Sequence, residues 1–259
     1  MINIEVVDLS VLICFWLAFC RWSALLIQIP ILDNVGIPAM VKVLFILLIT
    51  YAFHPYSKLS ILEDINAVGI NAFWILTVFN VLVGLVIGFF VKAILTIFTS
   101  AGSIITQQIG FGAIRYFDQS TSQQIGPFEK LISLTIVVLI LTSGALIPIF
   151  QGGLNSFMSI KFVDIGKMKF VIEYFIQLFH SIISSAILLA SPLIFTNILI
   201  MCVLGIIARI VPQMNVLMVS FVINIGVGLL IFYITSDEFF KVAFRMYTKK
   251  LGEWFQFIT

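Results

Sequence analysis

The sequence predicts an all-α integral membrane protein with about six hydrophobic helices, and two properties of its composition support this fold class. Hydrophobic residues make up 61% of the 259 residues, and charged residues only 10%. A soluble domain carries about 25% charged residues, which form the surface that faces water. Because this chain has too few charges for such a surface, lipid or protein partners must cover much of it.

The third observation is a series of long stretches without Asp, Glu, Lys or Arg, since each such charge is costly in hydrocarbon. Arg21 alone separates the first two, so we expect one helix there. The polar stretches at 33–38, 58–64, 107–130, 152–169 and 209–213 are expected to be loops or helix ends. The charge-free stretches are Val11–Cys20, Trp22–Leu32, Val43–Ser57, Ile65–Val91, Leu131–Ile160, Tyr174–Ala208 and Ile210–Ser236.

The lengths of these stretches do not fit a simple bundle of bilayer-spanning helices. About 20 residues cross the hydrocarbon layer, whereas Tyr174–Ala208 would run about 50 Å at about 1.5 Å per residue. Pro192 and several polar residues, among them Thr196 and Asn197, lie within this stretch. We expect two over-long or kinked helices, and helix faces that pack against protein.

The chain is predicted to form one membrane domain over residues 1–259, because no repeat or long linker divides it. Residues 1–169 would supply the N-terminal helices, with a central loop at about 106–122. Residues 170–259 would form a C-terminal helical hairpin and an amphipathic tail.

Catalytic chemistry is not expected, and neither is a cofactor or a bound metal. His54 and His180 stand alone in apolar surroundings, and the three cysteines show no metal-ligand spacing. The chain has no Gly-Lys-Ser/Thr loop for a nucleotide phosphate. A net charge of +2 is too small to indicate nucleic acid as a partner.

Arg21 is the best candidate for a functional charge inside the membrane. A structural role, in which the cation pairs with a helix carbonyl or an acid, is favoured over a transport role. Gly84 and Gly88 form a G-x-x-x-G pattern, which allows another backbone to approach closely. Packing inside the chain and packing between subunits explain this pattern equally well.

The central stretch from Thr106 to Asp118 combines flexible glycines with bulky apolar side chains. Such a segment can plug a pore, because a hydrophobic constriction excludes water and ions without any charge. On the sequence alone, a re-entrant or surface loop packed on the chain's own helices is favoured. The glycines are Gly110 and Gly112, and the bulky residues are Ile109, Phe111, Ile114, Tyr116 and Phe117.

A second informative place lies where two long charge-free stretches meet. Arg209, Pro212, Gln213 and Asn215 combine a proline with hydrogen-bonding side chains there. This composition predicts a tight corner between two helices.

Three groups of residues match a known pattern: Pro30–Leu32 with Pro38 and Lys42, then Gly102–Phe111 with Asp118, and finally Arg209 with Pro212–Asn215. Through them the chain resembles, over almost its whole length, the export-gate family called FliR in flagella, which is related to the SctT proteins of virulence type III secretion. Gln119 stands where the family often has proline, and Ser220–Asn224 replaces a Gly-Phe-Pro pattern followed by lysine. These departures bear mainly on the choice between the two systems.

The resemblance implies a protein export gate in the bacterial inner membrane, at the flagellar basal body or secretion apparatus, with much of the complex on the periplasmic side. Its partners would be five copies of a FliP-like protein, four of a FliQ-like protein, a larger export-gate membrane protein, membrane lipid and unfolded secreted proteins. The subunits would form helical hairpins wound into a hetero-oligomeric cone. The central loop would plug the closed channel. The corner between Arg209 and Asn215 would contact other subunits during assembly, and so would Gly84 and Gly88.

Two alternatives from other classes stay open at this stage. The first is a secondary transporter of a small solute, with Arg21 or Glu173 in the substrate path. The second is a scaffold with no contact to the pore, which differs from the gate subunit only at the central loop.

Overall fold

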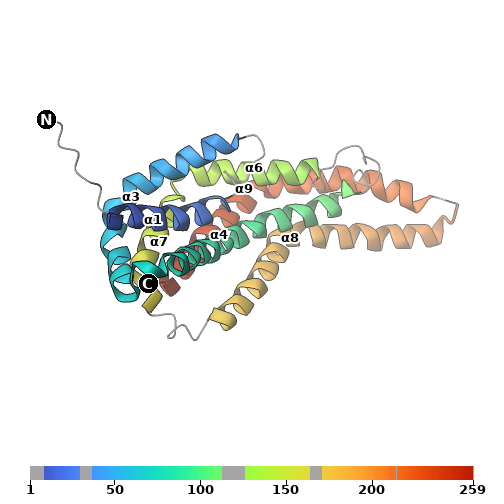
Figure 1. Cartoon of the computed structure of the whole chain (residues 1–259). Helices are drawn as coiled ribbons and strands as arrows, with labels where there is room; N and C mark the ends of the chain where they lie inside the picture. The colour runs from blue at the N-terminus through green and yellow to red at the C-terminus, as the bar shows by residue number, and fades with distance from the viewer. Residues whose placement is uncertain (1–8, 30–36, 113–125, 164–170, 214, 259) are drawn as a thin grey trace. The chain divides into compact units, whose positions relative to one another are not determined.

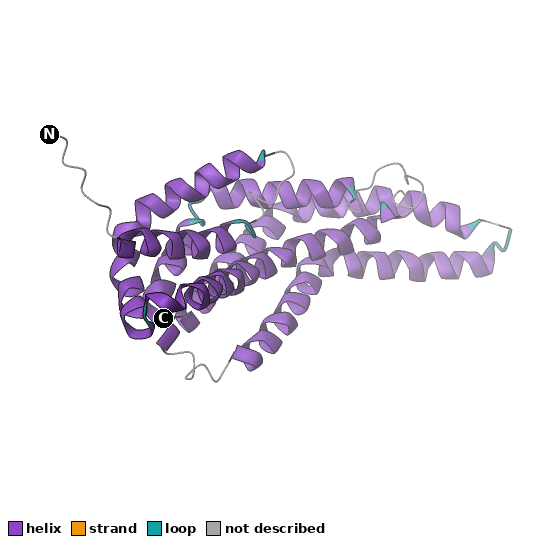
Figure 2. Cartoon of the chain, viewed as in Figure 1, coloured by secondary structure: helices purple, strands orange, loops and turns teal. Residues whose placement is uncertain are grey.

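The computed structural model describes residues 9–29, 37–112, 126–163, 171–213 and 215–258, and these residues form helices joined by short connections (Figure 2). None of them forms a strand, so the predicted all-α fold class is confirmed. The helices, labelled in Figure 1, are α1 (Leu9–Leu26), α3 (Ala39–Val68), the 3₁₀ helix η1 (Ile70–Ala72), α4 (Phe73–Ile109), α6 (Pro127–Thr142), α7 (Ile147–Ser159), α8 (Val171–Ile210) and α9 (Val216–Ile258).

Within the described residues, five helices are long and apolar enough to cross a membrane, or six if α6 and α7 are taken as one broken span. This agrees with the predicted number of about six. With 37, 40 and 43 residues, α4, α8 and α9 exceed the length of about 20 residues that a bilayer requires. α8 contains Pro192, which cannot donate a helical hydrogen bond, and Figure 1 shows that this helix bends.

The expected break at 58–64 is wrong, because α3 continues through these residues to Val68. Its polar side chains find partners inside the fold. The Ser60 hydroxyl donates a hydrogen bond to the Phe157 carbonyl, and Asp64 Oδ1 accepts one from the Phe162 N–H at 3.2 Å. Polar residues that are satisfied in this way need no contact with water.

The predicted continuous stretch Leu131–Ile160 is also wrong, since α6 ends at Thr142 and α7 begins at Ile147. Gly144 lies in this break with a φ of 71°, a conformation that suits glycine. By contrast, Gly153 was expected in a polar break, yet it lies inside α7. A Cβ atom there would come within 2.7 Å of the Trp22 ring, so the glycine makes room for that ring.

The chain divides into two compact units, and segments of the two units alternate along the sequence. Unit 1 comprises Met1–Ile94, Gly144–Tyr174 and Lys249–Thr259, and unit 2 comprises Leu95–Ser143 and Phe175–Thr248. Each unit is therefore built from stretches that lie far apart in the sequence. The single membrane domain over residues 1–259 stays a prediction.

Aromatic side chains form much of the core of unit 1. Trp22 is almost fully buried and stacks on Phe53, with ring centroids 5.5 Å apart. Phe90 from α4 stacks on Trp254 from the end of α9 at a centroid distance of 3.6 Å. Large rings contribute much apolar contact area, and their mutual packing fixes the spacing of the helices that carry them.

Gly84 and Gly88 bring α4 close to α1 within unit 1. A Cβ atom on Gly84 would lie 2.4 Å from the Arg21 carbonyl oxygen, and one on Gly88 would lie 2.9 Å from the Leu25 carbonyl oxygen. Of the two roles that the sequence left open, the structure thus shows packing inside the chain. A further role of these glycines in assembly stays a prediction.

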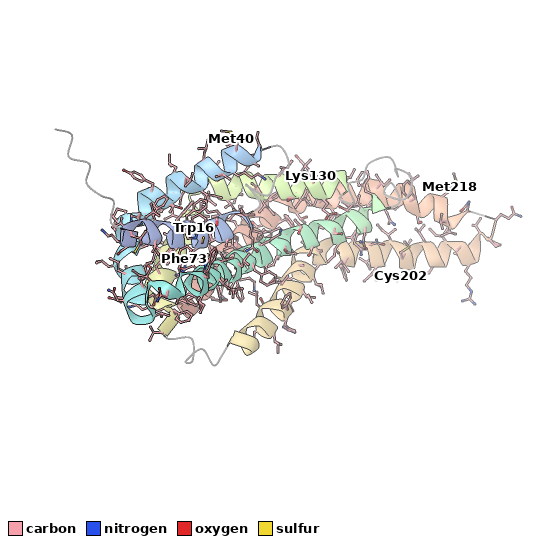
Figure 3. All side chains as sticks on the ribbon, viewed as in Figure 1. Trp16, Met40, Phe73, Lys130, Cys202 and Met218 are labelled. Atoms are coloured by element: carbon pink, nitrogen blue, oxygen red, sulfur yellow. The ribbon has the colours of Figure 1, made fainter. Side chains whose placement is uncertain are left out.

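Unit 2 combines the second part of α4 with α6 and with most of α8 and α9. Its buried side chains include Phe98, Ile105 and Leu193. Other faces of α8 and α9 expose large apolar residues, such as Leu217 and Tyr233, with exposed fractions of 79% and 81%. Figure 3 shows such side chains along both helices, so lipid or other subunits must cover these faces.

Replacing Gly84 with alanine tests the close packing of α1 and α4. The added methyl group would meet a backbone oxygen, which cannot rotate away, so we expect a loss of about 1–3 kcal/mol in unfolding free energy. Gly226→Ala is the matched control, because nothing lies within 4 Å of a Cβ there. It should be neutral or stabilising by up to about 1 kcal/mol. Thermal unfolding in detergent, followed by tryptophan fluorescence, checks both; equal stability of Gly84→Ala and the parent chain would contradict this packing.

Candidate functional site

Arg21 lies at the centre of a hydrogen-bond network in unit 1. Its side chain is 2% exposed. Nε donates a hydrogen bond to Asn80 Oδ1 at 2.9 Å, and Nη1 donates one to the Ser156 carbonyl oxygen at 2.8 Å. The guanidinium group also lies 4.2 Å from the centroid of the Phe157 ring, a favourable position for a cation.

The position of Ser156 explains how a buried cation is tolerated without a directly bonded acid among the described residues. α7 ends at Ser159, and the Ser156 carbonyl near this end accepts hydrogen bonds from both the Ile160 N–H, at 3.0 Å, and Arg21. The C-terminal end of a helix also carries a partial negative charge. The structure therefore supports the structural reading of Arg21, in which the cation pairs with helix carbonyls.

The end of α4 in unit 2 is the place where the predicted plug loop begins. The helix stops at Ile109, and Gly110 follows with a φ of 96°, which favours glycine. The Gly110 N–H donates a hydrogen bond to the Gln107 carbonyl at 3.1 Å. Ile109 is fully buried and packs on Gly228 of α9, where a Cβ atom would come within 3.0 Å of its side chain.

These positions divide the predicted plug residues into three groups. Ile109 has no exposed surface in this conformation, so it anchors the segment within unit 2. Gly110, Phe111 and Gly112 are half-buried. Ile114, Tyr116 and Phe117 lie outside the described residues, and the sealing role of the whole set stays a prediction.

The corner between α8 and α9 has the local structure that its composition suggests. Arg209 is exposed in the last turn of α8, where a cation complements the helix dipole. Pro212 and Gln213 form the exposed turn. Asn215 Oδ1 then accepts a hydrogen bond from the Met218 N–H at 3.3 Å and caps the start of α9. Whether these four residues contact other subunits stays a prediction.

Sequence reasoning did not single out the amide contacts that join α4 to α8. Asn197 Nδ2 donates hydrogen bonds to the backbone oxygen of Gln108 at 3.0 Å and to its Oε1 at 2.6 Å. The available signal was the presence of amide side chains in otherwise apolar helices, where they generally bond across an interface. Their spacing in the sequence gives no indication of which residues pair.

The described helices and their polar contacts define a class of protein. Helices long enough to span a membrane carry polar networks that hold helices together, and no group of three or more His, Cys, Asp or Glu in the described residues could hold a metal ion. This is an integral membrane protein of a structural or transport type. The chain belongs to the family "Bacterial export proteins, family 1", whose model matches residues 12–249.

Curated relatives come from flagellar and from virulence-associated systems. The flagellar biosynthetic protein FliR of Bacillus subtilis is 28% identical over 90% of each chain. FliR of Escherichia coli is 24% identical over 83% of this chain and 80% of its own. The surface presentation of antigens protein SpaR of Shigella flexneri is 26% identical over 87% of each chain. The chain is thus a membrane subunit of a type III export apparatus, which implies membrane-protein partners.

Replacing Arg21 with leucine should destabilise unit 1. The change leaves Asn80 Oδ1 without its donor, and a buried acceptor without a partner costs about 1–3 kcal/mol. Arg21→Lys keeps the charge but loses the planar guanidinium group with its fixed N–H donors. Its stability should therefore lie between those of the parent chain and Arg21→Leu. The exposed Arg245 provides the control, Arg245→Leu. Thermal unfolding in detergent is the measurement, and an unchanged midpoint for Arg21→Leu would contradict the structural role.

Proposed function

We propose that this chain is a channel-lining and assembly subunit of a type III protein export gate in the bacterial inner membrane. The observation that carries the proposal is the family match over residues 12–249, to which the exposed apolar faces of α8 and α9 add support. Large side chains on both helices lack cover within the chain, as expected of a subunit that packs against sister proteins. Passage of unfolded proteins through such an assembly requires no catalytic group in this chain.

The proposed partners are small membrane proteins of the same gate: five copies of a FliP-like subunit and four of a FliQ-like subunit around one copy of this chain, together with a larger export-gate membrane protein. Packing between helices, and not burial in lipid alone, would explain the lengths of α4, α8 and α9. A helix of 43 residues runs about 65 Å, roughly twice the hydrocarbon thickness. Part of α9 would therefore extend beyond the bilayer in the assembled cone, on the periplasmic side.

The proposed plug is the segment that begins at the end of α4. Ile109, buried against Gly228, would hold its start, and Gly110 would let the backbone turn away from the helix. Phe111 and the bulky residues that follow would then fill the closed channel. A constriction lined by such side chains blocks ions by excluding water.

The flagellar system is the first choice for this gate, and a virulence secretion system is the alternative. Relatives of both kinds cover most of the chain at similar identity, 28% for FliR of Bacillus subtilis and 26% for SpaR of Shigella flexneri. Deleting the gene separates the two systems: loss of motility would indicate the flagellar gate, and loss of virulence-protein secretion would indicate the alternative.

Deletion of residues 110–117 should make the assembled gate leak ions, because the hydrophobic seal would be lost. The measurement is ion or small-solute flux into vesicles that contain the reconstituted complex. A variant in which the same eight positions carry Gly and Ser should also leak, since length is kept and bulk is removed. A complex that assembles normally and stays impermeable in both variants would contradict the plug.

Purification of the tagged chain tests the gate against the transporter alternative. We expect native mass spectrometry to detect one copy of this chain with two other small membrane proteins. A secondary transporter would instead be stable as a monomer or homodimer and would move a solute alone in vesicles. Arg21 disfavours that alternative, because its donors are already bonded to Asn80 and Ser156.

A further inference from the structure

Three amide side chains from three helices meet at the end of α4 in unit 2. They are Gln108 of α4, Asn197 of α8 and Asn224 of α9, and all three line one small cavity. We call this group the amide cluster. It lies directly before Ile109 and Gly110, where the helix ends, so it is placed to control where the central segment starts.

The bond between Asn197 and Gln108 solves a problem at the helix end. The Gln108 carbonyl is one of the last four of α4, and these carbonyls find no N–H donor within the helix. Asn197 Nδ2 donates to this oxygen at 3.0 Å and also to Gln108 Oε1 at 2.6 Å. A single side chain of α8 thus binds both the backbone and the side chain of the same residue, which fixes its position in two directions.

Asn224 supplies an unused acceptor beside this bond. Its side chain is 7% exposed, and Oδ1 accepts no hydrogen bond from the described part of the chain. Leaving a buried amide oxygen without a donor is unfavourable. The atom belongs to a residue that lines the cavity, so a donor located there can satisfy it.

The cavity has the size and lining of a site for one water molecule. Its volume is about 10 Å³, close to the minimum that one water needs. Thr196 also lines it, and because its hydroxyl donates to the Pro192 carbonyl at 2.8 Å, its oxygen lone pairs are available to accept. A water molecule there can donate one hydrogen bond to Asn224 and the other to Thr196.

We propose that one water molecule bound between Asn224 and Thr196 completes the amide cluster, and that the cluster locks the C-terminal end of α4 onto α8 and α9. The contact of Ile109 with Gly228 adds tight apolar packing beside the cluster, and the hydrogen bonds add a required direction. The lock therefore sets the place and direction in which the chain leaves α4. That it positions a channel plug rests on the function proposed above; the lock itself does not.

Hydrogen exchange on the purified full-length chain in detergent tests the lock without requiring gate activity. Asn197→Leu and Gln108→Leu should each speed exchange of the backbone amides of residues 107–112 by about tenfold, because local opening becomes easier. The matched control is Gln107→Leu, one residue away on the same helix and exposed. The control should leave these rates unchanged. Parent-like exchange at 107–112 in both test variants would overturn the lock.

A rescue variant guards against the possibility that a test variant simply fails to fold. Gln108→Asn combined with Asn197→Gln exchanges the lengths of the two side chains and keeps an amide pair, so slow exchange at 107–112 should return. In each variant, unchanged exchange in α6, which belongs to unit 2 with the amide cluster, shows that this unit is folded. Fast exchange at 107–112 in the double variant with a folded α6 would overturn the claim that amide pairing forms the lock.

Ion flux through the assembled gate separates this proposal from the plug proposal. Faster exchange with a new leak in Asn197→Leu supports both. Faster exchange without a leak supports the lock and counts against the claim that the lock positions the plug. The water is tested by a high-resolution structure of the complex, which should show one water within about 3.2 Å of Asn224 Oδ1. A protein donor in its place, or no water there, would overturn that part.

Discussion

Hydrocarbon offers no hydrogen-bond partners, so a polar group inside the bilayer needs a partner within the assembly. Carbonyls near helix ends are two of the places where side chains of this chain meet that constraint. Arg21 of α1 binds the end of α7, and Asn197 of α8 binds the end of α4. In both cases a side chain from one helix fixes the end of another. The few polar residues of an apolar chain thereby decide which helices touch and where each stops.

Close packing at glycines is the second feature that holds these helices together. Lipid tails are as apolar as leucine, so helices in a membrane associate through close packing more than through burial from water. The structure uses glycine for this purpose at several contacts: Gly84 against the backbone of α1, Gly153 beneath Trp22, and Gly228 beneath Ile109. Each glycine admits a neighbour that a methyl group would displace. This apolar chain thus has a specific arrangement of helices within each unit.

The sequence predicted the fold class, the number of spans and the corner at 209–215, because charge-free stretches and a proline act locally. It failed at 58–64, where charges suggested a loop. There Asp64 is bonded to the Phe162 backbone, and a distant partner cannot be read from local composition. Gly84 and Gly88 showed that some backbone comes close, but not which one. The contact between Gln108 and Asn197 was missed for the same reason, since these residues lie 89 positions apart.

The contact of Ile109 with Gly228 couples the volumes of two distant positions. A carbon added at position 228 would lie 3.0 Å from the Ile109 side chain, so that side chain would have to move by a few tenths of an ångström. A smaller residue at position 109 would relieve this contact. Side-chain size at one position thus limits size at the other, although more than a hundred residues of chain separate them.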